Sequence, residues 1–173
     1  MGIRDWIGGQ EASQATPYCQ KGESQLAKEK YEAAIQNFNR GIDLDRGHVG
    51  CWIGMGRACI GLGQYDRADD CFVRALEIHP DHPEALAMRA SVLRLTALQK
   101  QDPLRCLEAV EICNKILKAH PEYGPALHEK GMALWTLGKR DEAMGLFEHA
   151  KKISPNYQYP WDLKGRYLFE RRQ

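Results

Sequence analysis

One set of residue types recurs along this chain every 34 positions. Aromatic, alanine, glycine and proline positions all take part, so the recurrence does not rest on a chance match of one residue type. The residues related by this step include Gly22 and Gly56, Tyr31 and Tyr65, Ala34 and Ala68, Phe38 and Phe72, Ala109 and Ala143, Pro121 and Pro155, and Gly131 and Gly165. A fixed period of roughly 20 to 50 residues is typical of chains built from stacked supersecondary units.

The step lengthens once, in the middle of the chain. It is 41 residues from Ala68 to Ala109, which places a seven-residue insertion between Ala90 and Ala109. Because seven residues are about two helical turns, we expect the insertion to lengthen both helices of this repeat rather than to form a loop, with Asp102 and Pro103 starting the second helix. The predicted organisation is a flexible amphipathic segment over residues 1–14, repeats over 15–48, 49–82, 83–123 and 124–157, and a capping half repeat over 158–173.

The pattern inside each repeat predicts a helical hairpin. In the second repeat, apolar residues from Tyr65 to Leu76 recur at helical spacing, so one face of a helix is expected to be buried. The segment Gly61 to Gly63 suits the tight turn before this helix, and Pro80 suits its end. One hairpin cannot cover its own apolar face, so neighbouring hairpins must stack.

These residues resemble the tetratricopeptide repeat family over about residues 15 to 169. The clearest copies are WIGMGRACIGLGQYDRADDCFVRALEIHP (52–80) and LHEKGMALWTLGKRDEAMGLFEHAKKISP (127–155). The resemblance implies an all-α fold, a right-handed α-solenoid (superhelix) of helix-turn-helix repeats with a C-terminal capping helix. Three positions depart from the family pattern: Gly41 replaces an alanine, Arg46 a proline and Cys113 an aromatic residue.

The resemblance also implies a concave groove, formed by the first helix of each repeat, that binds a protein or peptide partner. The groove positions it assigns are Ile53, Arg57, Ile60, Ser91, Arg94, His128, Met132, Trp135, Arg166 and Phe169, with Cys19, Glu23, Leu26, Ala87 and Asp162 on the same face. Apolar residues with interspersed arginines fit a helix or extended segment that carries an apolar anchor and a nearby acid. Family members that grip the C-terminal acid of heat-shock chaperones use lysine and asparagine here. This set contains neither, so that partner class is not expected.

An alternative interpretation applies to the largest groove residues. Trp135, Met132 and Phe169 also suit a purely structural role, in which they fill gaps between helices.

A second alternative concerns function: the chain would be a self-associating assembly factor, a homo-oligomer formed through the N-terminal segment or the terminal repeats. The N-terminal segment carries Trp6 between isoleucines, which suits such a contact.

No pattern predicts catalysis, and we expect no enzyme activity, no cofactor and no metal site. The glycines lie on the repeat period rather than in a phosphate-binding loop after a strand. The nearest approach to a metal motif is His79-Pro80-Asp81-His82, which falls in a turn between repeats. No two of the six cysteines form a CxxC pair, and the N-terminal sequence does not read as a secretory signal. Both features favour free thiols. Four of them fall on apolar helical stripes, where a thiol packs as a small hydrophobic side chain.

Charge and hydropathy exclude two kinds of partner. The chain has 24 Lys and Arg against 23 Asp and Glu, so it has no strong field to attract nucleic acid or an anionic membrane. No apolar run approaches the length of a membrane span or of a secretory signal, and we expect a cytoplasmic protein. The function predicted from the sequence is therefore a protein–protein interaction scaffold.

Overall fold

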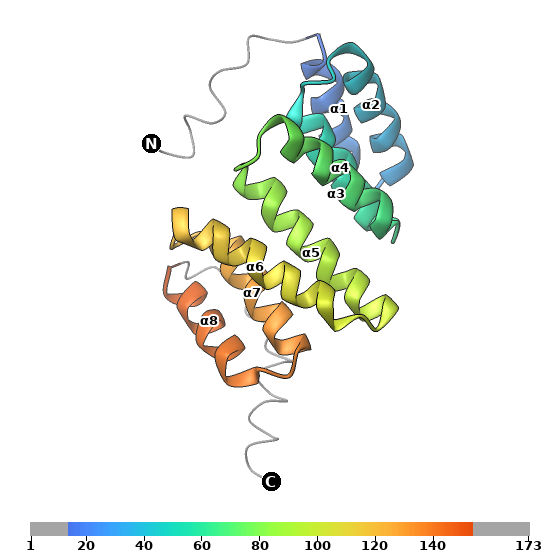
Figure 1. The fold of residues 1–173 in the computed structure, drawn as a ribbon. Coiled ribbons are helices and arrows are strands. Elements are labelled where there is room, and N and C mark those ends of the chain that lie inside the picture. Colours follow the sequence, from blue (N-terminus) through green and yellow to red (C-terminus); the bar gives the residue numbers. More distant parts are fainter. Residues whose placement is uncertain (1–13, 154–173) are drawn as a thin grey trace. The chain divides into compact units, whose positions relative to one another are not determined.

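The computed structural model describes residues 14–153, and all the regular elements in this range are α-helices. They are α1 (Thr16–Leu26), α2 (Tyr31–Leu44), α3 (Val49–Gly61), α4 (Tyr65–Ile78), α5 (Pro83–Lys100), α6 (Pro103–Ala119), α7 (Gly124–Thr136) and α8 (Arg140–Ile153) (Figure 1). Consecutive helices pack as the hairpins α1–α2, α3–α4, α5–α6 and α7–α8. The predicted all-α fold of helical hairpins is confirmed. Residues 1–13 and the predicted capping half repeat lie outside the described range.

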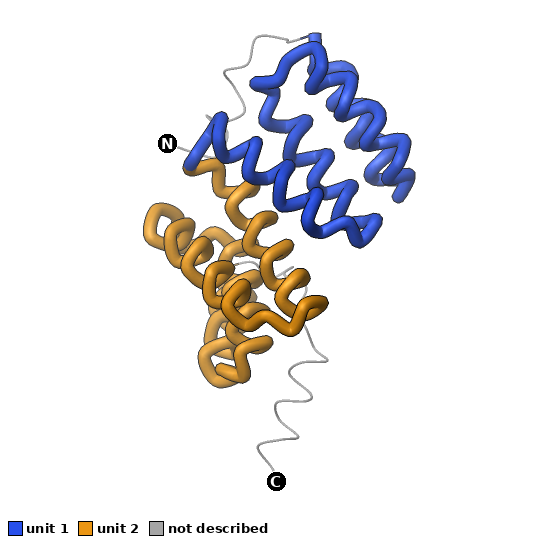
Figure 2. The backbone as a smooth tube through the Cα atoms, turned by 45° about the vertical axis from the view of Figure 1, so that its right-hand side comes forward, with its two compact units in different colours: residues 1–80 blue, residues 81–173 orange. Residues whose placement is uncertain are grey.

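The helices fall into two compact units (Figure 2). Unit 1 covers residues 1–80 and contains α1 to α4, and unit 2 covers residues 81–173 and contains α5 to α8. In unit 1, α3 packs against both α1 and α2, and in unit 2, α7 packs against both α5 and α6. Within each unit, the first helices of the two hairpins therefore lie side by side.

A glycine on the first helix of a hairpin lies against a phenylalanine on the second, and this contact recurs. The pairs are Gly22 with Phe38, Gly56 with Phe72, and Gly131 with Phe147. The three rings are fully buried, and a Cβ on any of these glycines would lie 2.5–2.6 Å from a ring carbon. The third hairpin fills the same space differently, because Ala90 and Cys113 replace the glycine and the ring and are both fully buried. A larger residue on one helix thus compensates for a smaller one on the other.

Glycine and proline end the helices where the sequence predicts. Helix α3 ends at Gly61, and Gly63 in the following turn has a φ of 71°, in the left-handed region that glycine adopts without a steric penalty. Helix α4 ends at Ile78, before Pro80, and α5 begins at Pro83. Proline suits this first helical position because its missing N–H would have no intrahelical partner there.

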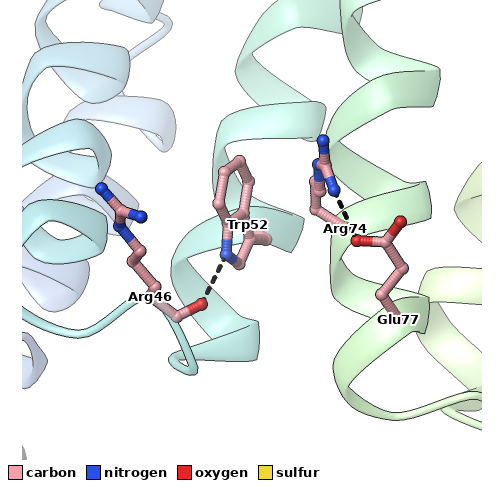
Figure 3. A network of polar contacts seen from close by, with 4 residues as sticks. All are labelled: Arg46, Trp52, Arg74 and Glu77. Carbon is pink, nitrogen blue, oxygen red and sulfur yellow. Dashed lines mark hydrogen bonds and ion pairs between the residues drawn. The ribbon is translucent and has the colours of Figure 1, made fainter.

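The turn between α2 and α3 is held by an indole. Trp52 Nε1 donates to the carbonyl oxygen of Arg46 at 3.0 Å (Figure 3). This bond satisfies a backbone acceptor in the turn, at the position where the family pattern has proline. Figure 3 also shows the ion pair between Arg74 and Glu77 on α4, at 2.7 Å. That pair is exposed, and such pairs contribute little to stability.

The additional residues of the third hairpin are helical. Helices α5 and α6 contain 18 and 17 residues, against 13 and 14 in α3 and α4. Gln101, with a φ of 54°, ends α5, and the Asp102 carboxylate accepts from the N–H of Leu104 at 3.1 Å to cap α6. The prediction that the insertion lengthens both helices is therefore confirmed.

We expect Asp102→Ala to lower the free energy of unfolding by about 1 kcal/mol, because it removes the side-chain cap of α6. Asp102 also pairs with Arg105 at 3.4 Å, so the matched control is Asp102→Asn, which keeps a capping oxygen and loses the charge. Denaturant unfolding of the two variants measures the difference. Equal losses for both would show that the ion pair, and not the cap, stabilises this helix start.

Candidate functional site

The predicted groove residues lie on the first helices of the hairpins. We define the first-helix face of unit 1 as Glu23, Leu26, Ile53, Arg57 and Ile60, on α1 and α3. We define the first-helix face of unit 2 as Ser91, Arg94, His128, Met132 and Trp135, on α5 and α7. Ala87, which was predicted on this face, is fully buried in the core. Asp162, Arg166 and Phe169 lie outside the described residues.

An ion pair joins the two helices of the unit 1 face. Arg57 Nη1 donates to Glu23 Oε2 at 3.0 Å, and the two side chains are 41% and 42% exposed. Ile60 is half-buried beside them, whereas Ile53 is only 5% exposed and belongs to the core. Arg57 remains accessible, but a partner's acid would compete there with Glu23.

A second ion pair joins the two helices of the unit 2 face, and this one is buried. Arg94 Nε donates to Glu129 Oε2 at 3.2 Å, and the two residues are only 8% and 9% exposed. The expectation that Arg94 is an exposed groove charge is wrong, because Arg94 is buried against Glu129. Glu129 was not among the predicted groove positions, and it corresponds to Gln20, Gly54 and Met88 in the earlier repeats. A glutamate at a position that holds glycine and methionine in the second and third repeats is the signal that would have identified it.

The aromatic end of the unit 2 face is half-buried. Met132 and Trp135 pack against the core cluster formed by α7 and α8. The guanidinium carbon of Arg140 lies 5.6 Å from the centre of the Trp135 ring, a cation–π contact. Met132 and Trp135 therefore each have one side in the core and one side accessible from outside.

His128 lies on the same face and turns towards the core. Its ring centre is 6.1 Å from that of Phe147, at an interplanar angle of 46°. Burial lowers the pKa of His128, so the imidazole is neutral at neutral pH. His128 thus contributes a polar but uncharged group beside Met132.

All six cysteines are buried free thiols, and four of them form two pairs in unit 1. The Cys51 thiol hydrogen-bonds to Cys19, which lowers the pKa of Cys19 and raises that of Cys51. In the same way, a hydrogen bond from Cys71 lowers the pKa of Cys59 to about 7. In unit 2, burial, together with the nearby charge of Glu129, raises the pKa of Cys113 to about 12. The sequence predicted the packing of these thiols but not their pairing.

The cysteine pair Cys19–Cys51 has a third neighbour, His48. One ligand atom from each of the three residues lies within 4.8 Å of the others, and all three residues are buried. The His79-to-His82 motif is used differently, because His82 Nδ1 accepts from the N–H of Ala85 at 3.3 Å and caps α5. In the part of the chain that the structure describes, the Cys19, His48 and Cys51 group is the cluster that could hold a metal ion.

None of the helices in the described range is long and apolar enough to cross a membrane.

Comparison with known proteins places the chain among repeat proteins. Two sequence profiles of the tetratricopeptide repeat family match it, over residues 25–92 and 124–157. The anaphase-promoting complex subunit 3 of Schizosaccharomyces pombe is 25% identical over 139 residues, which are 80% of this chain and 20% of that protein. The chain spans a fifth or less of the length of the curated relatives that it matches.

Solved structures show the same fold. A thermophilic TPR protein of Thermus thermophilus superposes with a TM-score of 0.76 at 16% identity, covering 82% of this chain and 75% of that one. The first TPR of Spaghetti (RPAP3), bound to an HSP90 peptide, superposes with a TM-score of 0.64 at 21% identity, covering 74% of this chain and 96% of that one.

Proposed function

The chain belongs to the tetratricopeptide repeat family, and on that premise we propose that it is a non-enzymatic scaffold that binds a segment of a partner protein on the first-helix face of unit 2. The observation that carries this proposal is the pair Met132 and Trp135. Both side chains are anchored in the core on one side and accessible on the other. Partly buried aromatic residues that are already held in place make strong binding sites, because little conformational freedom is lost when a partner docks.

The buried ion pair of this face supports the same proposal. Arg94 and Glu129 link α5 to α7, so the two helices that form the face are held together before any partner arrives. The pair has no net charge, so Arg94 is not the residue that receives a partner's acid. A positive charge beside the apolar anchor is Arg140, whose guanidinium carbon lies 5.6 Å from the centre of the Trp135 ring. An acidic residue next to the partner's apolar anchor would therefore lie near Arg140.

Support also comes from a relative of known structure. The first TPR of Spaghetti holds an HSP90 peptide on the same fold. Our chain lacks lysine and asparagine among the predicted groove residues, so we propose a different segment, with an apolar anchor in place of a C-terminal acid as the main contact. The first-helix face of unit 1, with Arg57 and Ile60 accessible, offers a second contact surface.

We expect Trp135→Ala to weaken partner binding by at least about 2 kcal/mol, the effect of losing a central aromatic hot spot. Partners are captured from an extract of the source cell by the full chain, identified by mass spectrometry, and then titrated as purified proteins against wild type and variant. The matched control is Trp52→Ala, which removes an indole from α3 of unit 1 and is not one of the residues of the proposed face. It should leave affinity within a few tenths of a kcal/mol.

Melting of each variant is measured in parallel, because Trp135 also packs against the core. A large fall in melting temperature with unchanged affinity per folded molecule would show that Trp135 only fills space, and the proposed site would then be wrong.

Self-association is the second candidate function, and one observation favours it. The tip of the α5–α6 hairpin carries Leu98, Leu104 and Leu107, which are 54%, 70% and 48% exposed. Exposed apolar residues gathered at one end of a hairpin suit a protein contact. The mass of the full chain in solution, compared with that of a chain lacking residues 1–14 and of a Leu104→Ser variant, separates this function from binding to a different protein.

A further inference from the structure

Inside unit 1, Cys19 on one helix meets His48 and Cys51 at the start of another. Cys19 is the fourth residue of α1, His48 immediately precedes α3, and Cys51 lies in the first turn of α3. One ligand atom from each lies within 4.8 Å of the other two, and all three residues are buried. Two sulfurs and an imidazole nitrogen are the donor set that borderline-soft metal ions such as zinc prefer.

The role of His48 as a helix cap does not account for the thiols. His48 Nδ1 accepts from the N–H of Cys51 at 3.2 Å, and one repeat later His82 Nδ1 accepts from the N–H of Ala85 in the same way. The cap therefore recurs along the chain. The thiols do not recur, because the residues one step after Cys19 and Cys51 are Ile53 and Ala85.

Two glycines leave the space that the cluster occupies. A Cβ on Gly41 would lie 2.6 Å from the sulfur of Cys51, and alanine occupies the corresponding position in the second and fourth hairpins, as Ala75 and Ala150. A Cβ on Gly50 would lie 3.2 Å from the His48 ring and 3.5 Å from the Cys19 sulfur. The departure of Gly41 from the family pattern is thus explained by the position of the Cys51 thiol.

We propose that Cys19, His48 and Cys51 bind one zinc ion in unit 1. Zinc replaces the protons of the two thiols, so two protons are released to water and two thiolates become ligands. Two thiolates, a neutral imidazole and a divalent ion carry no net charge together, which suits a buried site. A fourth tetrahedral position remains for water.

Only small movements separate the thiol state from the metal-bound state. Tetrahedral zinc with bonds of about 2.3 Å to sulfur and about 2.0 Å to nitrogen separates its ligand atoms by roughly 3.5–3.8 Å. The observed atoms, within 4.8 Å of one another, reach this spacing by side-chain rotation. A neutral imidazole has one free nitrogen lone pair, so His48 exchanges its capping bond to the Cys51 N–H for the bond to the ion.

The second thiol pair of unit 1 serves as an internal control. Cys59 and Cys71 also hydrogen-bond to each other and are buried, but among residues 14–153 no histidine completes a group of three ligands with them. The proposal therefore places the ion at the first pair and not at the second.

The test is a metal titration of the reduced full chain with cobalt(II) as the spectroscopic probe. We expect thiolate-to-cobalt charge-transfer absorption that saturates at one equivalent and disappears when zinc is added. Zinc should also protect Cys19 and Cys51, but not Cys59 and Cys71, from alkylation after partial unfolding, as read by peptide mapping. If the wild-type chain shows no charge-transfer absorption with cobalt(II), the proposal is wrong, and no variant is needed to decide it.

Variants then identify the ligands. His48→Asn keeps an oxygen that can cap α3 and removes the imidazole, so it should weaken cobalt binding at least about tenfold, whereas His82→Asn should leave it unchanged. Changing Cys59 and Cys71 together to alanine should also leave binding unchanged. Circular dichroism confirms that each variant is folded. Unaltered binding in His48→Asn, or its loss in the Cys59 and Cys71 variant, would show that the ion lies elsewhere.

Discussion

Replacing Glu129 with alanine is expected to lower the free energy of unfolding by about 3 kcal/mol or more. The substitution leaves the Arg94 guanidinium buried without its counter-charge, and a buried charge that loses its partner is strongly destabilising. The Arg94 and Glu129 side chains are only 10% and 11% exposed, so water cannot replace the lost carboxylate. Denaturant unfolding followed by circular dichroism measures the loss.

The control for this experiment is the ion pair of unit 1. Glu23→Ala removes the same type of partner from Arg57, at a similar distance, but from side chains about 40% exposed. Exposed pairs contribute about 0–1 kcal/mol, so this variant should lose no more than that. Similar losses in the two variants would contradict the assignment of the Arg94–Glu129 pair as buried. The comparison isolates burial, because the chemistry of the two pairs is the same.

The second large effect is expected from the contact between Gly131 and Phe147. Phe147→Cys should lower the free energy of unfolding by about 3 kcal/mol, since it removes a fully buried ring and leaves a cavity. Gly131→Ala alone should lower it by about 1–2 kcal/mol, because its Cβ would lie 2.5 Å from a ring carbon and the ring must shift. The two changes together reproduce the Ala90 and Cys113 pair of the third hairpin.

The double variant should therefore be less destabilised than the sum of the two single changes, by about 1 kcal/mol or more. Gly145→Ala is the matched control, because Gly145 also lies within a helix and its added Cβ would meet no neighbouring side chain or other helix within 4 Å. It should be neutral or slightly stabilising, since alanine favours helices by about 1 kcal/mol over glycine. Strict additivity of the two changes would contradict the size compensation inferred for this contact.

The helices and their ends could be predicted because their causes are local. The spacing of apolar residues from Tyr65 to Leu76 indicates a helix with one apolar face, and Pro83 and Asp102 favour helix starts through their own backbone and side-chain chemistry. The 34-residue step then requires the hairpins to stack, and the longer helices of the third hairpin follow from a seven-residue insertion, about two helical turns, together with the helix start at Asp102 and Pro103. The groove positions were placed by resemblance to the family, and their role in binding stays a prediction.

The partners of individual side chains depended on how neighbouring helices pack. Arg94 meets Glu129 because α5 and α7 lie side by side, and no local pattern links a groove arginine to a glutamate outside the groove set. Cys19 joins His48 and Cys51 for the same reason, through the contact of α1 with α3. The sequence by itself specified the period, the hairpins and the apolar faces. Tertiary structure alone decided which charged side chains of different helices pair, which of them are buried, and which thiols and imidazole lie together. These features depend on distances between atoms that the chain brings together from different helices.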